Sequence, residues 1–294
     1  MAKIATIGFF DGVHRGHRFL FAQLQEHAKH LHLSTAIYTF KQHPKQVLTN
    51  VSPAMLTTFE ERKRLLEEYG EVCFLDFSEV QKFTAAEFMR YLHDEQGVEA
   101  LLIGYDHRFG SDCLKGFSEY EHLGREIGIH VLRAYECLVD GVPVSSSRIR
   151  KLLTAGKLRD VKRLLGYGYT LSGVVEHGNA IGTTLGFPTA NIALGSHKQL
   201  PAKGVYSVLA NVDGVSYHAI ANIGTKPTIG GEKLSLEVYM FDFVGDLYGK
   251  ALQVTFLDFL REEKKFASLD ALKKQIASDV QGVRNALGVD DLKG

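Results

Sequence analysis

The stretch Gly-Phe-Phe-Asp-Gly-Val-His-Arg-Gly-His at residues 8–17 constrains the fold of this chain more than any other. The apolar run from Ile4 to Phe10 predicts a buried strand that leads into it. Apolar residues near the 3.6-residue period predict a helix after it, namely Phe19, Leu20, Leu24, Ala28 and Leu31. A strand, a glycine-containing turn and a helix in this order are typical of open α/β sheets, which bind ligands at such junctions.

The turn between strand and helix predicts an anion site. Free backbone N–H groups and the helix dipole favour phosphate there, and glycines let the backbone approach a ligand closely. His14 and His17 are three residues apart, so one face of the first helical turn can carry both. We expect this turn to neutralise charge on a nucleotide triphosphate. A pattern this short, taken alone, is equally compatible with a turn that carries two surface histidines.

Strands and helices continue to alternate through the first half of the chain. Further strands are expected at Leu33–Phe40, Val72–Leu75, Ala100–Tyr105 and Ile129–Ala134. Further helices are expected at Thr58–Tyr69, which begins with a capping box, and at Thr84–Gln96, Phe117–Ile127 and Leu152–Leu165. The run 100–105 is almost purely apolar, as in a strand that is buried on both faces. This alternation predicts an α/β fold with a doubly wound parallel sheet.

Polar clusters follow these strands and should meet at the carboxyl edge of the sheet. They are Gly8–His17, His43, Asp106–Gly110 and Val144–Arg150. Ser145, Ser146 and Ser147 stand at a helix start, where they can cap the helix or bind phosphate. Arg150 is a planar, permanently charged donor that suits the same phosphates. Individually, His43 is compatible with a solvated loop residue and the serines with ordinary caps, but their convergence favours a site.

The pattern changes near Gly166-Tyr167-Gly168, where we place a domain boundary that separates residues 1–165 from 166–294. Strand-like runs follow at Tyr169–His177, Gly204–Val212, Tyr217–Ile223, Leu234–Phe243 and Leu252–Phe259. Asp213-Gly214 between two of them is a strong hairpin signal. Short strands at this spacing predict a small antiparallel barrel. One amphipathic helix, Leu269–Leu287, closes the chain with the stripe Leu272, Ile276, Val280 and Val283.

The loop at residues 178–191 carries glycines at four-residue spacing, which suits a flexible cover over phosphates. Thr189 and Asn191 offer neutral oxygens of the kind that Mg²⁺ accepts together with nucleotide phosphates and water. Neither a P-loop nor a protein-kinase catalytic loop is present. Glu237 interrupts an apolar strand, where it is either a solvent-facing residue or a general base for a hydroxyl.

Charge and cysteine content exclude several classes of protein. Lys plus Arg and Asp plus Glu are equal at 34 each, so broad electrostatic binding to nucleic acid or to an anionic membrane is not expected. The three cysteines, Cys73, Cys113 and Cys137, show neither zinc spacing nor a disulfide framework, which favours the cytoplasm. No apolar run approaches membrane-spanning length, and no signal peptide is apparent.

The first half resembles the nucleotidyltransferase superfamily, whose His-x-Gly-His signature occurs at residues 14–17. The longer stretch, together with residues 39–44, 104–110 and 144–150, resembles the adenylyltransferase part of bacterial bifunctional riboflavin kinase/FMN adenylyltransferases. The resemblance implies catalytic roles for His14, His17 and Arg150. It implies ATP or phosphate binding by Gly8, Phe10, Asp11, Gly16, Ser145, Ser146 and Ser147, and FMN binding by His43, Asp106 and Arg108.

Departures from this family pattern gather at the flavin end of the site. They are Gln42, His107 and the pair Ser111-Asp112, where a basic residue is usual, whereas the departure at Ser147 lies in the phosphate-binding part. Asp112 would place a negative charge near the incoming FMN phosphate, and like charges repel. We therefore expect adenylylation to be present but weaker than the kinase activity.

The second half resembles riboflavin kinase through residues 186–191, 222–228, 246–249 and 261–266. The resemblance implies that Thr189 and Asn191 bind Mg²⁺ with ATP, that Glu237 is the catalytic base and that Arg261 lies beside the flavin. It also implies ATP binding by Gly178, Gly182, Gly186 and Pro188. Thr183 departs from the pattern, because a basic residue is common there.

The expected function is therefore flavin cofactor synthesis from small-molecule substrates. ATP phosphorylates riboflavin to FMN, and ATP then adenylylates FMN to FAD with release of pyrophosphate. The expected fold is the α/β sheet domain followed by a flavokinase-like barrel with a C-terminal helix. Two alternatives are a riboflavin kinase whose first domain is a degenerate flavin- or nucleotide-binding module, and a flavin-sensing regulator without turnover.

Overall fold

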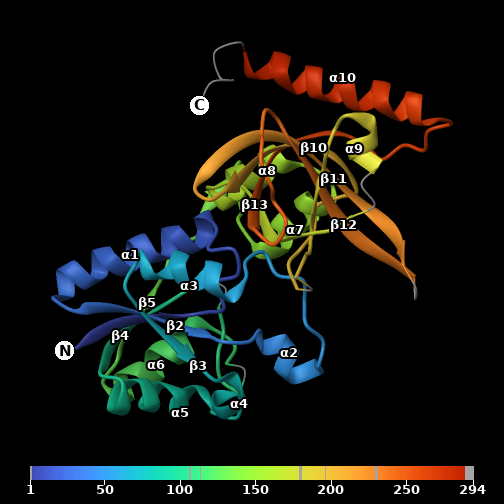
Figure 1. Ribbon diagram of the computed structural model, residues 1–294. Coiled ribbons are helices and arrows are strands. Elements are labelled where there is room, and N and C mark those ends of the chain that lie inside the picture. Colours follow the sequence, from blue (N-terminus) through green and yellow to red (C-terminus); the bar gives the residue numbers. More distant parts are fainter. Residues whose placement is uncertain are drawn as a thin grey trace. The chain divides into compact units, whose positions relative to one another are not determined.

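The chain forms two compact units, residues 1–148 and 149–294, in a computed structural model (Figure 1). The structure describes residues 2–105, 107–112, 114–178, 181–195, 197–228 and 231–288. Each unit has its own sheet, so each is described separately.

The first unit is built on a five-stranded parallel sheet in the order β3-β2-β1-β4-β5. The strands are β1 (Lys3–Ile7), β2 (Ser34–Phe40), β3 (Glu71–Leu75), β4 (Val98–Ile103) and β5 (His130–Arg133). This order confirms the predicted doubly wound sheet. The strands are added on one side of β1 from β2 to β3 and on its other side from β4 to β5, so the strand order reverses between β1 and β4. The topological switch point therefore lies where the chain leaves β1 and β4.

Helices cover both faces of this sheet (Figure 1). One face carries α1 (Arg15–Leu31) and α3 (Phe59–Glu67), whose buried residues include Phe21, Leu24 and Leu66. The other face carries α5 (Ala85–Arg90), the π-helical turn Tyr91–Glu95 and α6 (Phe117–Ile127). The predicted capping box at Thr58 forms, and Thr84 forms a second one that was not predicted. Apolar burial on both faces explains why β4 reads as an unbroken apolar run.

Several elements of the first unit differ from the sequence-based expectation. Strand β1 ends at Ile7 rather than Phe10, and the positive φ of Phe10, 56°, is one that no strand accommodates. Short elements not predicted from the sequence are α2 (Pro44–Thr49), α4 (Phe77–Val80), β6 (Leu138–Val139) and β7 (Val142–Pro143).

Two helices replace the single one expected at residues 152–165. Helix α7 spans Ser146–Thr154 and α8 spans Leu158–Leu165. Gly156 separates them with a φ of +68°, a left-handed conformation that glycine adopts readily. Helix α7 begins in the first compact unit and ends in the second.

The second unit is a closed antiparallel barrel in the order β10-β11-β12-β9-β8-β13, as predicted. Its strands are β8 (Thr170–Glu176), β9 (Ala190–Ile192), β10 (Gly204–Val212), β11 (Val215–Thr228), β12 (Gly231–Met240) and β13 (Ala251–Arg261). Asp213 and Gly214 form the expected hairpin turn between β10 and β11, both with positive φ. Strand β9 begins within the predicted cover loop and ends one residue beyond it, and the loop also contains the short helix α9 (Ile181–Leu185).

The C-terminal helix α10 spans Leu269–Leu287 as predicted, with Ser268 as its N-cap. Ile276, Val280, Val283 and Leu287 pack on Ile220, Tyr239 and Phe241 of the barrel unit. No helix in the described part of the chain is long and apolar enough to cross a membrane.

Candidate active sites

The two histidines of the first turn stack at the N-terminus of α1. Their ring centroids are 3.6 Å apart, and the N–H of His17 donates to His14 Nδ1 across 3.4 Å. His14 is the N-cap of α1, and the Phe10 ring meets His17 edge-on at 5.3 Å. The predicted sharing of one helix face is therefore confirmed, and both imidazoles lie at the switch point of the sheet.

The ring of His17 is poised as a neutral hydrogen-bonding group. Burial, and secondarily the neighbouring His14, lowers the pKa of His17 well below its ordinary value. Its Nδ1 is buried, and no group among the described residues hydrogen-bonds to it. A buried imidazole nitrogen at a helix N-terminus fits an external ligand with phosphate oxygens.

Asp11 and Ser146 hold this turn in place. Both carboxylate oxygens of Asp11 accept from the N–H of Leu56 at 3.0 Å, and Thr57 N donates to one of them at 3.1 Å. Ser146 Oγ donates to the backbone carbonyl of Asp11 at 3.0 Å. These contacts give Asp11 and Ser146 a structural role, and direct binding of ATP by either stays a prediction.

The glycines of the turn are packed closely. A Cβ at Gly8 would lie 2.7 Å from the Phe10 ring, and one at Gly16 would lie 3.0 Å from the His14 ring. Ser145 Oγ accepts from the N–H of Arg148 at 3.3 Å, so it caps α7, while Ser147 is exposed. Arg150 lies in α7 within the second compact unit, and its predicted role toward ATP stays a prediction.

A cavity of about 430 Å³ opens beside the turn, on the face of the sheet covered by α5 and α6. It is lined by Ile7, Phe9, Phe40, Pro44, Phe77, Val80, Gln81, Phe83, Phe88, His107, Arg108, Phe109 and Gly110. Phe9 lines this cavity, whereas Phe10 packs with α1 on the other side of the sheet. Aromatic walls with a few polar groups are typical of sites for a planar ligand.

The predicted FMN residues lie around this cavity. Arg108 lines it, and the ring of His43 contacts Phe9 at 4.6 Å between centroids. His43 also caps α2 by accepting from Lys45 N at 3.0 Å. Asp106 lies outside the described residues. Asp112 accepts from the N–H of Ala85 at 2.9 Å, so its carboxylate caps α5, and its expected effect on FMN stays a prediction.

Arg62 is a buried cation that the sequence analysis missed. Arg62 is only 2% exposed. Its guanidinium donates to the carbonyl of Phe9 at 3.1 Å and to that of Phe40 at 2.6 Å. The guanidinium carbon also lies 3.8 Å from the centroid of the Phe9 ring. Burial lowers the pKa of Arg62 to about 10, so it stays charged at neutral pH. The sequence does carry a signal that Arg62 is buried, because it lies four residues before Leu66 and therefore on the apolar face of α3.

The barrel carries a second constellation on its outer face. Strand register places Asn222, Glu237 and Asn191 in one row across β11, β12 and β9. Alternating residues such as Leu236 and Val238 are buried inside the barrel, so this row points outward. Asn222 belongs to the row although the sequence analysis gave it no role. A carboxylate in a row with two amides suits a base positioned beside a polar substrate.

Asn222 and Glu237 of this row border a cavity of about 330 Å³ with largely apolar walls. Its described lining comes from the barrel, the 182–189 segment and α10: Gly182, Leu185, Phe187, Thr189, Val205, Ile220, Ala221, Asn222, Glu237, Tyr239, Arg261, Glu263, Lys264, Phe266, Leu272, Ile276 and Asp279. Thr189, Glu237 and Arg261 were predicted on one site from the sequence, and the structure brings them to one cavity.

Gly178 and Gly182 approach the side chains of Asn191 and Thr189 closely. A Cβ at Gly178 would lie 2.0 Å from Asn191 Nδ2, and one at Gly182 would lie 3.1 Å from Thr189 Oγ1. The hydroxyl and amide oxygens of Thr189 and Asn191, next to the Glu237 carboxylate, fit the hard-ligand preference of Mg²⁺. Gly186 and Pro188 are exposed and lie outside the described lining, so ATP contacts there stay predictions.

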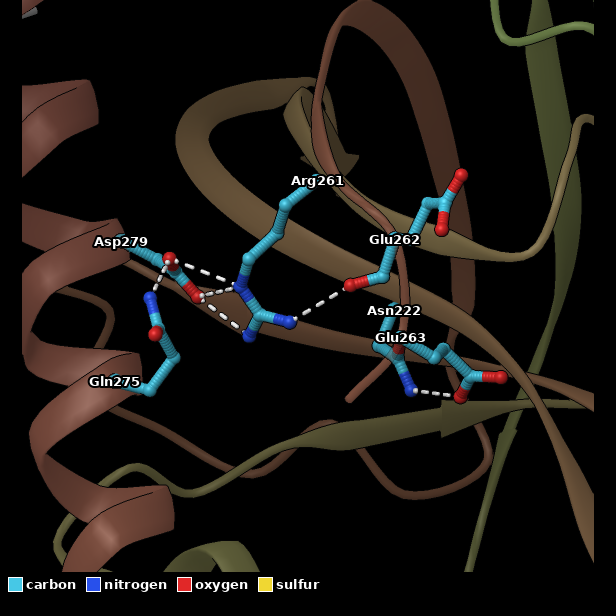
Figure 2. A network of polar contacts seen from close by, with 6 residues as sticks. All are labelled: Asn222, Arg261, Glu262, Glu263, Gln275 and Asp279. Atoms are coloured by element: carbon cyan, nitrogen blue, oxygen red, sulfur yellow. Dashed lines mark hydrogen bonds and ion pairs between the residues drawn. The ribbon is translucent and has the colours of Figure 1, made fainter. Parts of the chain in front are cut away.

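Figure 2 shows the polar contacts around Arg261, which ends β13 and lines this cavity. Its guanidinium donates to both carboxylate oxygens of Asp279 on α10 at 2.7–3.1 Å and to the carbonyl of Glu262 at 3.0 Å. Asn222 Nδ2 donates to Glu263 at 3.4 Å. The flavin contact predicted for Arg261 is compatible with this place, since the residue lines the cavity.

Fold and sites together define an enzyme with a nucleotide-binding α/β unit and a separate barrel unit. Residues 1–148 match the FAD synthetase family, and residues 165–287 match the riboflavin kinase family. The chain therefore belongs to the bacterial bifunctional riboflavin kinase/FMN adenylyltransferase family.

Relatives named bifunctional riboflavin kinase/FMN adenylyltransferase are similar along nearly their whole length. The one from Pseudomonas fluorescens is 40% identical over 96% of this chain and 92% of the relative. The one from Escherichia coli K12 is 37% identical over 97% and 93%. A solved structure described as a macrolide-efflux protein from Streptococcus pneumoniae aligns with a TM-score of 0.89 at 33% identity, covering 97% of this chain and 94% of that one.

Proposed function

We propose that this chain makes FAD from riboflavin in two steps, one in each unit. The barrel unit phosphorylates riboflavin with ATP, and the α/β unit adenylylates the resulting FMN with a second ATP. The observation that carries the proposal is the pairing of two complete constellations, the His14–His17 stack and the Glu237–Asn191 row, in a chain that matches both families. This match favours the two-step enzyme over a kinase with a degenerate first domain and over a regulator.

In the kinase step, the terminal ribityl hydroxyl of riboflavin attacks the γ-phosphorus of ATP. The new O–P bond forms as the bond to the ADP leaving group breaks, and Glu237 accepts the hydroxyl proton. Thr189 and Asn191 would hold Mg²⁺, which neutralises phosphate charge when bound. The largely apolar walls of the 330 Å³ cavity suit a site in which transfer of the phosphoryl group to water is disfavoured.

In the adenylyl step, a phosphate oxygen of FMN attacks the α-phosphorus of ATP and pyrophosphate leaves. No protein nucleophile is required, so the residues act by positioning and by charge stabilisation. The neutral ring of His17 donates one hydrogen bond to the phosphates, and His14 orients the turn through the N–H of His17. The aromatic cavity beside Phe9 accepts the flavin ring.

The test is an assay of the purified full chain with ATP and Mg²⁺, in which flavins are separated by chromatography. Riboflavin should give FMN and FAD, and FMN should give FAD. His17→Ala should abolish FAD formation from FMN and spare FMN formation from riboflavin. His30→Ala, an exposed histidine on the same helix, is the matched control. Equal loss of both activities in folded His17→Ala would contradict two separate sites.

Glu237→Gln should show the opposite pattern, because it keeps the shape of the side chain and removes the base. The kinase rate should fall by about 10²–10⁴-fold, the usual contribution of general-base catalysis. FAD formation from FMN should stay unchanged, which makes it the internal control for folding. A kinase rate within about threefold of wild type would exclude Glu237 as the base.

A further inference from the structure

Arg261 is clamped at the edge of the kinase cavity by a residue outside the motifs of the sequence. Its Nε lies 3.1 and 3.0 Å from the two oxygens of Asp279, and its Nη2 lies 2.7 Å from Oδ2 (Figure 2). Gln275, one turn earlier on α10, donates to Asp279 Oδ1 at 2.8 Å. The side chains of Arg261 and Asp279 are 15% and 8% exposed, so water contributes little to this network.

The pairing matters because of what surrounds it. Arg261 and Asp279 line the cavity beside Phe266, Leu272 and Ile276, where a lone cation would lose hydration without compensation. The two-point contact with Asp279 neutralises the guanidinium and fixes its plane. Riboflavin carries no net charge, and its ring system offers carbonyl oxygens and ring nitrogens as acceptors. A neutral, rigid pair therefore suits it better than a free cation.

The contacts of Arg261 leave hydrogens for such a ligand. Nε and one hydrogen of Nη2 point to Asp279, and one hydrogen of Nη1 points to the carbonyl of Glu262. One hydrogen on Nη1 and one on Nη2 remain beyond these contacts. They lie in the guanidinium plane that Asp279 sets, so rotation of that plane would misdirect both.

We propose that Asp279, supported by Gln275, is a positioning residue that orients Arg261 toward the isoalloxazine ring of riboflavin. The proposal rests on the kinase activity proposed above. It gives α10 a role in flavin binding, while Thr189, Asn191 and Glu237 serve phosphoryl transfer. Loss of Asp279 should therefore weaken riboflavin binding and leave the handling of ATP unchanged.

The competing explanation is that the ion pair only fastens α10 to the barrel. The chain offers a control, because a second, more exposed ion pair joins the same helix to the turn that follows β12. Arg284 Nη2 lies 2.8 and 3.0 Å from the carboxylate oxygens of Asp242, and both residues lie outside the described lining of the cavity. Asp242→Asn thus removes an ion pair of α10 without touching the cavity.

The experiment compares Asp279→Asn, Gln275→Leu and Asp242→Asn in the full chain. Riboflavin affinity is measured without ATP from quenching of flavin fluorescence, and the KM values for riboflavin and ATP are measured separately. Asp279→Asn should raise the Kd and KM for riboflavin at least tenfold and change the KM for ATP less than twofold. Gln275→Leu should shift riboflavin binding in the same direction by a smaller factor, and Asp242→Asn less than twofold.

Equal weakening of riboflavin binding by Asp279→Asn and Asp242→Asn would overturn the proposal, because both would then act by loosening α10. Tighter binding in Asp279→Asn would also overturn it, by showing that Asp279 competes with the flavin for Arg261. If Asp279→Asn does not fold, the Gln275→Leu variant becomes the test of the proposal, because it keeps the charges of both Arg261 and Asp279. Wild-type protein that binds riboflavin but forms no FMN would instead refute the proposed kinase function, and the binding measurements would still test Asp279.

Discussion

His17 is a titratable residue that is held neutral by burial. It lies at the N-terminus of α1, a position that favours anions. Its pKa in the folded protein lies well below 6.5, chiefly because of burial. At a pH between the folded-state pKa and 6.5, the imidazole of His17 is protonated in the unfolded chain and neutral in the folded chain. The free energy of unfolding therefore falls as the pH falls. Stability is thus fully retained above about pH 6.5 and is lost progressively below it.

This predicts an acid sensitivity of the α/β unit that depends on one side chain. Between pH 6.5 and 5.5, wild type should lose up to about 1 kcal/mol of unfolding free energy more than His17→Gln. Denaturant unfolding of both proteins at several pH values, followed by circular dichroism, measures the difference. Parallel pH profiles for the two proteins would show that His17 does not titrate in this way.

Single residues also show where sequence reasoning succeeds and where it ends. His14 and His17 were found because their spacing and their place after a strand are local properties. Arg62 was missed because its partners, the carbonyls of Phe9 and Phe40, come from other elements that only the folded chain brings near. Asp11 was assigned to ATP from a motif, whereas its hydrogen bonds to residues 56–57 depend on a loop that follows 45 residues later.

At the scale of elements, the backbone that leaves β8 at Gly178 lies directly against the side chain of Asn191 in β9. A Cβ at Gly178 would lie 2.0 Å from Asn191 Nδ2, a distance that forces the amide to move. We expect Gly178→Ala to raise the KM for ATP in the kinase reaction at least tenfold and to leave FAD formation from FMN unchanged. Gly195→Ala is the control, since no described atom lies within 4 Å of a Cβ there. A similar KM for ATP in the two variants would show that the close approach of Gly178 to Asn191 does not matter for ATP binding.

Long elements were predictable and short ones were not. Helix α10 and the hairpin at Asp213-Gly214 carry a strong period and a strong turn signal, and both form as expected. Strand β9 has three residues and α9 has five, too few for a period to emerge. Helix α2 was missed because Pro44 was interpreted as the end of a strand, whereas proline is also favoured in the first turn of a helix.

At the scale of the whole molecule, the boundary between the units decides what the barrel needs in order to fold. The sequence places it near Gly166, whereas the second compact unit begins at Ile149 and includes most of α7 and all of α8. Leu153 O accepts from Ala202 N at 3.1 Å, and Arg159 forms an ion pair with Asp258 of β13 at 2.6 Å. These contacts join α7 and α8 to the barrel unit.

We therefore expect a fragment of residues 149–294 to fold and to phosphorylate riboflavin without the α/β unit. All proposed kinase residues lie within it, together with the buried α8 residues Leu158 and Val161. A fragment of residues 166–294 lacks those apolar side chains and should melt several degrees lower, because about 1 kcal/mol shifts the melting temperature of a domain of this size by about 4 °C. Thermal unfolding and kinase assays of both fragments provide the measurement. Equal melting temperatures would mean that α7 and α8 add nothing to the barrel, and a folded 149–294 fragment that binds riboflavin and ATP without turnover would show that the kinase site depends on the first unit.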